Sequence, residues 1–214
     1  MKVVIMAGGR GTRISSVASD IPKPMIKIEG KPVLEHEIEC LRDQGFKDII
    51  LTVSHLGNII MDYFGDGSGI SPVTGKSFGV SIEYYFEKEP LGNAGALFKI
   101  KDKLTEDFLL LNADAMFDVD FNRFVEFHKS HGKKATLTAV VQAQDKGVLN
   151  IDSDNSVKSF REKNIKDGAP INAGYMVLEP NIFDYIEGDN TIFEKDPLIR
   201  LSAEGQLMSY IHRW

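Results

Sequence analysis

The first thirteen residues end in a group of side chains and backbone amides that could bind phosphate. Gly8, Gly9 and Gly11 follow a short apolar run and come directly before Arg13. Because glycine has no Cβ, the N–H groups of such a turn can converge on phosphate oxygens. A guanidinium then pairs with phosphate through two N–H groups at once. The alternative is a tight strand-to-helix turn with an exposed arginine, which is the usual meaning of a lone Gly-x-Gly.

The standard phosphate-binding motifs do not fit this chain. A dinucleotide-binding fingerprint needs a third glycine where the sequence has Ile14. The segment GISPVTGKS, residues 69–77, has five residues between its glycines instead of the four of a P-loop, and a predicted strand follows it. We therefore interpret residues 65–79 as a polar loop that no core requires and that binds no nucleotide.

A second cation lies in the segment IPKPM, residues 21–25. The flanking prolines are expected to hold Lys23 in an extended segment and keep its ammonium from folding back on the chain. Lys23 and Arg13 would together place two cations beside the glycines. This arrangement suits a ligand that carries three or more phosphate charges. Taken alone, a Pro-Lys-Pro segment is usually only a surface loop.

Asp114 follows the apolar run FLLL closely and could bind a metal ion. The carboxyl end of a buried strand is where ligands bind in open α/β sheets. Mg²⁺ commonly takes one or two carboxylates from a protein when substrate phosphates supply its other ligands. A helix-capping role is the alternative for Asp114. Nearby, Asp120 is predicted to cap a helix that begins near Phe121.

Two polar groups in the second half could face the same cleft. Glu162 and Lys163 end a predicted strand, and Asn172 lies in the segment PINAGY. The carboxylate and the amide could bind sugar hydroxyls, and the ammonium could pair with a phosphate. The alternative interpretation is that these residues lie on an ordinary solvated surface. The histidines have no metal-ligand spacing.

The hydrophobic pattern predicts the elements that position these residues. Strands are expected at 2–6, 48–53, 80–86 and 108–111, and helices at 32–44, 56–64 and 94–104. This alternation favours a mostly parallel sheet covered on both faces. Strands at 135–142, 147–152, 157–160, 171–178 and 207–211 are expected to extend that sheet. We predict one domain over 1–214, with a nucleotide-binding half at about 1–131 and a sugar-binding half at about 132–214.

Composition excludes several classes of protein. The net charge of −6 argues against a nucleic-acid binder. A single cysteine, Cys40, rules out an internal disulfide framework and is typical of a reducing compartment. The sequence shows neither a signal peptide nor an apolar stretch long enough to cross a membrane, so we expect a cytoplasmic protein without a membrane partner.

Several motifs together resemble those of the sugar-1-phosphate nucleotidyltransferases. AGGRGTR, IPKPM, GKPVLEH, EKEPLGNAGAL, FLLLNAD, FREK and INAGY occur in that family's order and approximate spacing, from residue 1 to the C-terminus. The resemblance implies a Rossmann-like three-layer α/β/α fold with a mostly parallel mixed sheet. It also implies transfer of a nucleoside monophosphate from a nucleoside triphosphate to a sugar 1-phosphate, with Mg²⁺ as cofactor and pyrophosphate as product.

The resemblance also assigns roles to individual residues. Catalytic roles fall to Arg13, Lys23 and Asp114, and Asp114 is the metal ligand. Nucleotide binding is implied for Ala7, Gly8, Gly9, Gly11, Thr12, Arg13, Glu87 and Gly92. Binding of the sugar phosphate is implied for Lys23, Gly147, Glu162, Lys163 and Asn172.

The family resemblance also leads to expectations about the substrates and about the length of the natural chain. The motifs look most like those of bacterial enzymes that activate mannose or manno-heptose 1-phosphate with GTP. Family members carry a second metal-binding Asp and a Gly-Thr-Pro shortly after a Trp that matches Trp214, so we expect the natural chain to continue. A homo-oligomer and a fused C-terminal phosphatase domain stay open as partners. The alternative functions are a regulatory module that binds nucleotide without turnover, and transfer to a phosphate acceptor that is not a sugar.

Overall fold

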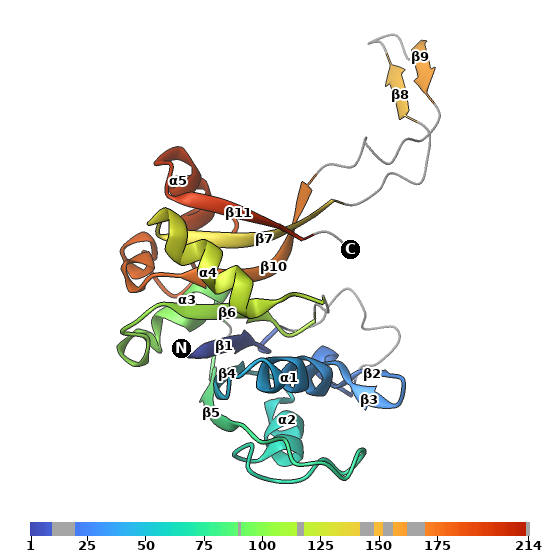
Figure 1. Cartoon of the computed structure of the whole chain (residues 1–214), viewed down its shortest axis with the longest axis vertical. Coiled ribbons are helices and arrows are strands. Elements are labelled where there is room, and N and C mark those ends of the chain that lie inside the picture. Colours follow the sequence, from blue (N-terminus) through green and yellow to red (C-terminus); the bar gives the residue numbers. More distant parts are fainter. Residues whose placement is uncertain are drawn as a thin grey trace.

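A computed structural model describes residues 1–9, 20–89, 91–114, 118–141, 148–151, 156–161 and 170–212. Its centre is a seven-stranded sheet in the order β11-β7-β10-β6-β1-β4-β5 (Figure 1). β10 runs antiparallel to β6 and β7, whereas the remaining neighbours are parallel. The predicted mostly parallel mixed sheet is confirmed. Its strands are β1 (Val3–Met6), β4 (Asp48–Val53), β5 (Ser81–Phe86), β6 (Phe108–Asn112), β7 (Ala135–Val141), β10 (Pro170–Leu178) and β11 (Leu207–His212).

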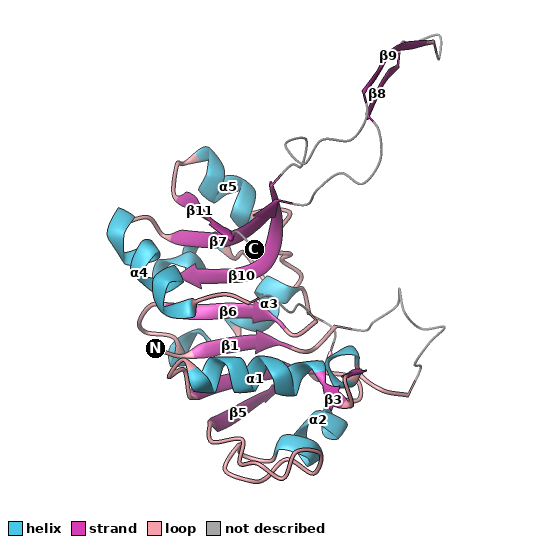
Figure 2. Ribbon diagram, turned by 45° about the vertical axis from the view of Figure 1, so that its right-hand side comes forward, coloured by secondary structure: helices cyan, strands magenta, loops and turns pink. Residues whose placement is uncertain are grey.

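Helices cover both faces of this sheet (Figure 2). One face packs against α1 (Val33–Asp43), α2 (Gly57–Phe64) and α4 (Phe121–His131). The other face packs against α3 (Asn93–Phe98), the 3₁₀ helix η4 (Pro180–Tyr185) and α5 (Pro197–Ala203). The three-layer α/β/α architecture expected from the sequence is therefore present.

Alternation along the central strands builds the two apolar layers. In β1, Val3 and Ile5 pack toward α1, whereas Val4 packs toward α3, and all three are fully buried. A strand covered on both faces needs apolar residues at nearly every position, which explains the unbroken run at its start. α4 begins where predicted, because the carboxylate of Asp120 accepts a hydrogen bond from the backbone N–H of Arg123 (3.0 Å).

The shorter elements include corrections to the sequence-based expectations. Lys23 does not lie in an extended segment but opens the 3₁₀ turn η1 (Lys23–Met25), because Met25 N–H bonds back to the carbonyl of Pro22 (2.8 Å). The helix predicted to reach residue 104 ends at Phe98, and a 3₁₀ turn η2 (Lys101–Lys103) follows. Two small antiparallel pairs lie outside the central sheet: β2 (Lys27–Ile28) with β3 (Lys31–Pro32), and β8 (Val148–Ile151) with β9 (Val157–Arg161). The strands expected at 147–152 and 157–160 therefore pair with each other and do not extend the central sheet, contrary to the sequence-based expectation.

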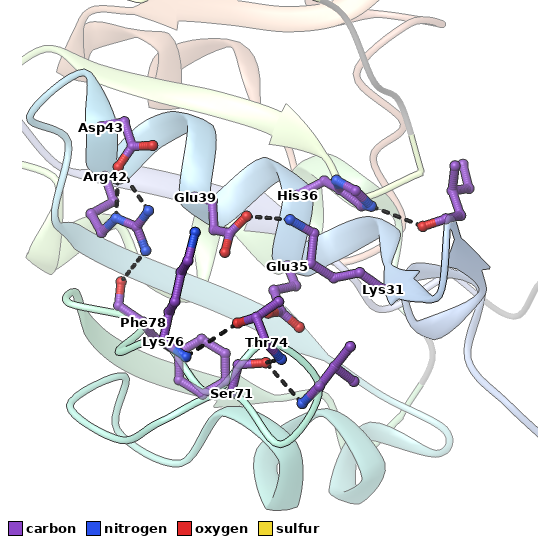
Figure 3. Close-up of polar contacts among 12 residues, drawn as sticks. Lys31, Glu35, His36, Glu39, Arg42, Asp43, Ser71, Thr74, Lys76 and Phe78 are labelled. Carbon is purple, nitrogen blue, oxygen red and sulfur yellow. Dashed lines mark hydrogen bonds and ion pairs between the residues drawn. The ribbon is translucent and has the colours of Figure 1, made fainter.

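The loop at residues 65–79 contributes to the core, contrary to the sequence-based interpretation. Phe78 is only 2% exposed, and its ring lies 5.0 Å from that of Phe64 in α2. Arg42 of α1 donates to the backbone carbonyls of Ser77 (3.1 Å) and Phe78 (3.4 Å), as Figure 3 shows for Phe78. These contacts fix the loop against α1 and α2, so part of the loop has a structural role.

A second loop, residues 188–196, packs against the start of α3. The N–H of Gly92 donates to the carbonyl of Asp189 (2.8 Å), and the N–H of Ala94 donates to that of Thr191 (3.2 Å). A Cβ on Gly95 would lie only 2.0 Å from the carbonyl oxygen of Asp189. The glycines in the motif GNAG therefore allow two backbones to approach more closely than any other residue would.

We expect Gly95→Ala to destabilise the fold although alanine favours helices. The new methyl group collides with backbone, so the loop must move, at a cost of about 1–3 kcal/mol. Urea denaturation of the variant beside Gly188→Ala measures this, since a Cβ at Gly188 in the same loop meets no atom within 4 Å. A gain in stability for Gly95→Ala, as in an exposed helix, would contradict the close packing.

Across the described residues, no helix has the length and apolar character that crossing a bilayer requires.

Candidate active site

A cleft of about 410 Å³ lies at the carboxyl ends of β1, β5 and β6. This is the edge at which open α/β sheets bind their ligands. Backbone and side chains from several segments surround it. The lining residues are Met6, Ala7, Gly8, Gly9, Lys23, Pro24, Glu87, Leu91, Asn93, Asn112, Ala113, Asp114 and Glu194.

The hydrogen bonding of the sheet continues one residue beyond the ends of β1 and β5 and fixes the positions of Ala7 and Glu87. The N–H of Ala7 donates to the carbonyl of Thr52 (2.9 Å), and the N–H of Glu87 donates to that of Val53 (2.8 Å). Gly8 and Gly9 follow the last paired residue of β1. Their peptide groups therefore reach the cleft from a rigid strand.

A cation and an anion face each other across part of this cleft. The ammonium of Lys23 lies 3.9 Å from the Oδ2 carboxylate oxygen of Asp114. The Lys23 side chain is 21% exposed and that of Asp114 is 58% exposed, so both charges are open to a ligand. Lys23 comes from η1 and Asp114 follows β6, so segments far apart in the sequence supply this pair.

Glu87 lies against Gly8 within the cleft. A Cβ on Gly8 would meet the Oε1 atom of Glu87 at 2.3 Å, so a side chain here would displace the carboxyl group. Burial raises the pKa of Glu87, and the backbone N–H of Leu91 opposes that shift. Ser54 donates its hydroxyl to the carbonyl of Gly8 and so helps to hold the turn.

The structure brings together part of the predicted site. Ala7, Gly8, Gly9, Lys23, Glu87 and Asp114 all line the cleft. Gly92 lies beside it at the start of α3. Asn172 lies in β10, three residues before Tyr175, and Tyr175 pairs with Leu111 of β6. The side-chain oxygen of Asn172 accepts a hydrogen bond from the backbone N–H of Gly174 (2.9 Å). The predicted residues that lie outside the described part of the chain are Gly11, Thr12, Arg13, Gly147, Glu162 and Lys163.

Three polar residues of the cleft were not predicted from the sequence, namely Asn93, Asn112 and Glu194. Asn93 lies within the motif GNAG, and Asn112 lies two residues before Asp114. Both positions could have been suspected from their neighbours. Glu194 gave no such signal, because only the packing of loop 188–196 on α3 carries it to the cleft.

The match to known proteins decides the family. The profile described as nucleotidyl transferase covers residues 2–211. The chain belongs to this family. A glucose-1-phosphate cytidylyltransferase from Salmonella typhi is 37% identical, over 99% of this chain and 88% of that protein. A mannose-1-phosphate guanyltransferase from Saccharomyces cerevisiae is 34% identical, over 98% of this chain and 58% of that protein.

A solved structure is similar to this chain over nearly its whole length. The crystal structure of HddC from Yersinia pseudotuberculosis complexed with GMP-PN is 33% identical, with a TM-score of 0.73 over 99% of this chain and 90% of that chain. The sugar-1-phosphate nucleotidyltransferase relationship predicted from the motifs is thus confirmed.

The donor set in the cleft fits a hard cation that shares its ligands with a substrate. Within the described residues, no group of three or more His, Cys, Asp or Glu side chains could hold a metal by itself. Asp114 offers one exposed carboxylate to the cleft of about 410 Å³. Mg²⁺ is commonly bound in this way, through one or two carboxylates together with phosphate oxygens and water.

Glu37 is a buried carboxyl group near Asp114 that was not predicted from the sequence. Glu37 of α1 is 4% exposed. Burial raises its pKa well above the ordinary value of 4.5; the hydroxyl of Tyr175 opposes the shift, and the negative charge of Asp114 adds to it. Glu37 shares the apolar face of α1 with Leu34, Ile38 and Leu41, a spacing that could have indicated its burial.

We expect Glu37→Gln to stabilise the protein increasingly as the pH rises above 4.5. The unfolded chain releases the Glu37 proton near that pH and the folded chain only at higher pH, so ionisation favours unfolding in between. Glutamine removes this effect. Thermal unfolding at pH 4.5 and pH 8 measures it, with Glu126→Gln on the exposed side of α4 as control. If Glu37→Gln instead loses the same stability at both pH values, the raised pKa of Glu37 in the folded protein is contradicted.

Proposed function

We propose that this chain transfers a nucleoside monophosphate from a nucleoside triphosphate to a sugar 1-phosphate and releases pyrophosphate. The observation that carries the proposal is the Lys23–Asp114 pair, whose charged atoms lie 3.9 Å apart in the cleft that the Gly8–Gly9 backbone lines. This pair offers a cation and a metal-type ligand near amide groups that suit phosphate oxygens. Membership of the nucleotidyl transferase family supports the same reaction.

The reaction needs positioning and neutralisation of charge more than it needs a nucleophile from the protein. An oxygen of the sugar phosphate forms a bond to the α-phosphorus while the bond from that phosphorus to the pyrophosphate oxygen breaks. No proton has to move. We expect the ammonium of Lys23 to offset the negative charge shared between the two phosphates. Arg13, to which the family motif assigns this role, would stabilise the leaving pyrophosphate.

Asp114 is the residue that we expect to hold Mg²⁺. When bound, the ion would neutralise charge on the triphosphate. Asp114 presents its carboxylate just beyond the end of β6, and Lys23 must release it for a cation to bind there. The sugar phosphate is expected to extend toward Asn172, with Gly147, Glu162 and Lys163 as the remaining predicted contacts.

For the nucleotide we favour GTP, with mannose or manno-heptose 1-phosphate as acceptor. Glu87, which lines the cleft, is the side chain that we expect to read the base. A carboxylate can accept from both the ring N–H and the 2-amino group of guanine, whereas cytosine offers only its amino group. The GMP-PN complex of HddC supports this choice. CTP with glucose 1-phosphate is the second candidate, because the Salmonella relative is a cytidylyltransferase.

Pyrophosphate release with Mg²⁺ tests the proposal directly. GTP, CTP, UTP, ATP and dTTP would each be combined with mannose, manno-heptose and glucose 1-phosphates. Turnover with GTP and a manno sugar is the expected result, and turnover with CTP and glucose 1-phosphate would select the second candidate. Saturable nucleotide binding without turnover, with this chain and with one extended past Trp214, would instead indicate a regulatory module.

A further inference from the structure

The peptide group between Gly8 and Gly9 can take two orientations that differ in what they offer to an anion. Neither residue has a Cβ, so this peptide can rotate about its flanking bonds at little steric cost. One orientation turns the N–H of Gly9 toward the cleft, where a phosphate oxygen can accept it, and the other turns the carbonyl oxygen of Gly8 there. Both residues line the cleft, so this orientation bears directly on phosphate binding.

Ser54 selects one of the two orientations. Its hydroxyl donates to the carbonyl oxygen of Gly8. The peptide is trans, and in a trans peptide the carbonyl and the following N–H point in opposite directions. The N–H of Gly9 therefore points away from Ser54. Among the described residues, none accepts a hydrogen bond from this N–H, so the donor is available to a ligand.

The order of the strands shows which side of the cleft this donor faces. β1 lies between β4 and β6 (Figure 1). Ser54 directly follows β4, so the carbonyl of Gly8 turns toward the β4 side and the N–H of Gly9 toward the β6 side. Asp114 follows β6 by two residues, and it lines the same cleft together with Lys23. The N–H is thus directed to the side at which we expect the phosphates.

Ser54 is itself held firmly, so its hydroxyl can fix the position of another group. The carbonyl of Val53 accepts from the N–H of Glu87 (2.8 Å), and the carbonyl of Ser54 accepts from the N–H of Gly57 (2.8 Å) at the start of α2. Ser54 is 9% exposed and is not among the described residues that line the cleft. It therefore acts through Gly8 and not by contact with a ligand.

We propose that Ser54 is a positioning residue, which holds the Gly8–Gly9 peptide with its N–H toward the phosphates and so raises the affinity for a triphosphate. The inference rests on the proposed nucleotidyl transfer for the identity of that ligand. Without the hydroxyl, the peptide also populates the orientation that presents the Gly8 carbonyl, which cannot donate to a phosphate oxygen. Only the molecules with the correct orientation then bind, and the apparent affinity falls by that fraction.

The test is the affinity of Ser54→Ala for inorganic tripolyphosphate with Mg²⁺, measured by calorimetry, because this probe carries the phosphates without a base or a sugar. The loss of one hydrogen bond predicts an affinity about threefold to tenfold weaker than that of wild type. The control is Thr138→Val, since Thr138 is fully buried and its hydroxyl also donates to a backbone carbonyl, that of Tyr175 (3.1 Å). This variant should bind tripolyphosphate as wild type does.

A second measurement observes the peptide itself. In ¹H–¹⁵N NMR spectra, tripolyphosphate should move the amide proton of Gly9 downfield, because a new hydrogen bond to an anion forms there. Ser54→Ala should need a higher concentration for the same shift. In the pyrophosphate assay, the KM for the nucleoside triphosphate should rise by the calorimetric factor, while the KM for the sugar 1-phosphate stays unchanged. A general loosening of the cleft would not produce this difference between the substrates.

Several outcomes would overturn the inference. They are a Gly9 amide that does not respond to tripolyphosphate, a Ser54→Ala variant with unchanged affinity, and a Thr138→Val variant that loses as much affinity as Ser54→Ala. A rise in the KM for the sugar 1-phosphate alone would also overturn it, since Ser54 would then serve the acceptor. If no pair of substrates turns over, the proposed function fails separately, and the two measurements with tripolyphosphate still decide the role of Ser54.

Discussion

Asp114→Asn should lower kcat by at least on the order of 10²–10³-fold while the fold remains intact. The substitution keeps the shape of the side chain and removes its charge. The amide is a much poorer ligand for a hard cation than the carboxylate, so the charge that develops on the phosphates is no longer offset. Asp114 is 58% exposed at its side chain, so its removal leaves no buried group unpaired.

Two measurements separate this result from unfolding. Pyrophosphate release gives kcat, and the shift in melting temperature caused by GTP, with and without Mg²⁺, reports binding independently of turnover. The variant should lose the part of the shift that depends on Mg²⁺. Asp102→Asn, in η2 before the amino end of β6, is the matched control and should behave as wild type. Full activity of Asp114→Asn, or a collapse of its unfolding transition, would remove Asp114 from the site.

Lys23→Met should lower kcat by a similar factor, on the order of 10²–10³-fold, because the variant keeps the aliphatic stem and loses only the charge. Lys23 is expected to lie between the phosphates of the two substrates, so kcat/KM should fall for both of them. The fold should hold, since η1 is fixed by backbone bonds and by the burial of Pro24 and Met25 rather than by the ammonium.

The comparison between substrates is what tests this role. Lys47→Met, an exposed lysine just before the amino end of β4, provides the control. A Lys23 variant that loses kcat/KM for only one substrate would place its ammonium on that substrate alone. An increase in activity would mean that the Lys23–Asp114 pair blocks the cleft instead of contributing to it. Arg13 belongs in the same series, on the basis of its motif.

Much of the fold could be predicted from local pattern. The strand at 48–53 was predicted with the bounds that the structure shows, and the Asp120 cap was identified from its position before Phe121. Such features depend on a few neighbouring residues, namely an apolar run or a capping carboxylate. The loop at 65–79 was misjudged because the burial of Phe78 depends on Phe64 and Arg42, which local pattern does not bring together.

The site divides in the same way. The types and spacing of Gly8, Gly9, Lys23 and Asp114 are enough by themselves to indicate phosphate chemistry, because each follows a strand or a proline that is visible in the sequence. Tertiary structure alone decided the 3.9 Å approach of Lys23 to Asp114 and the presence of Glu194 in the cleft. The reason is physical: these contacts join segments that are distant in sequence, and only the packing of helices and loops on the sheet sets their distance.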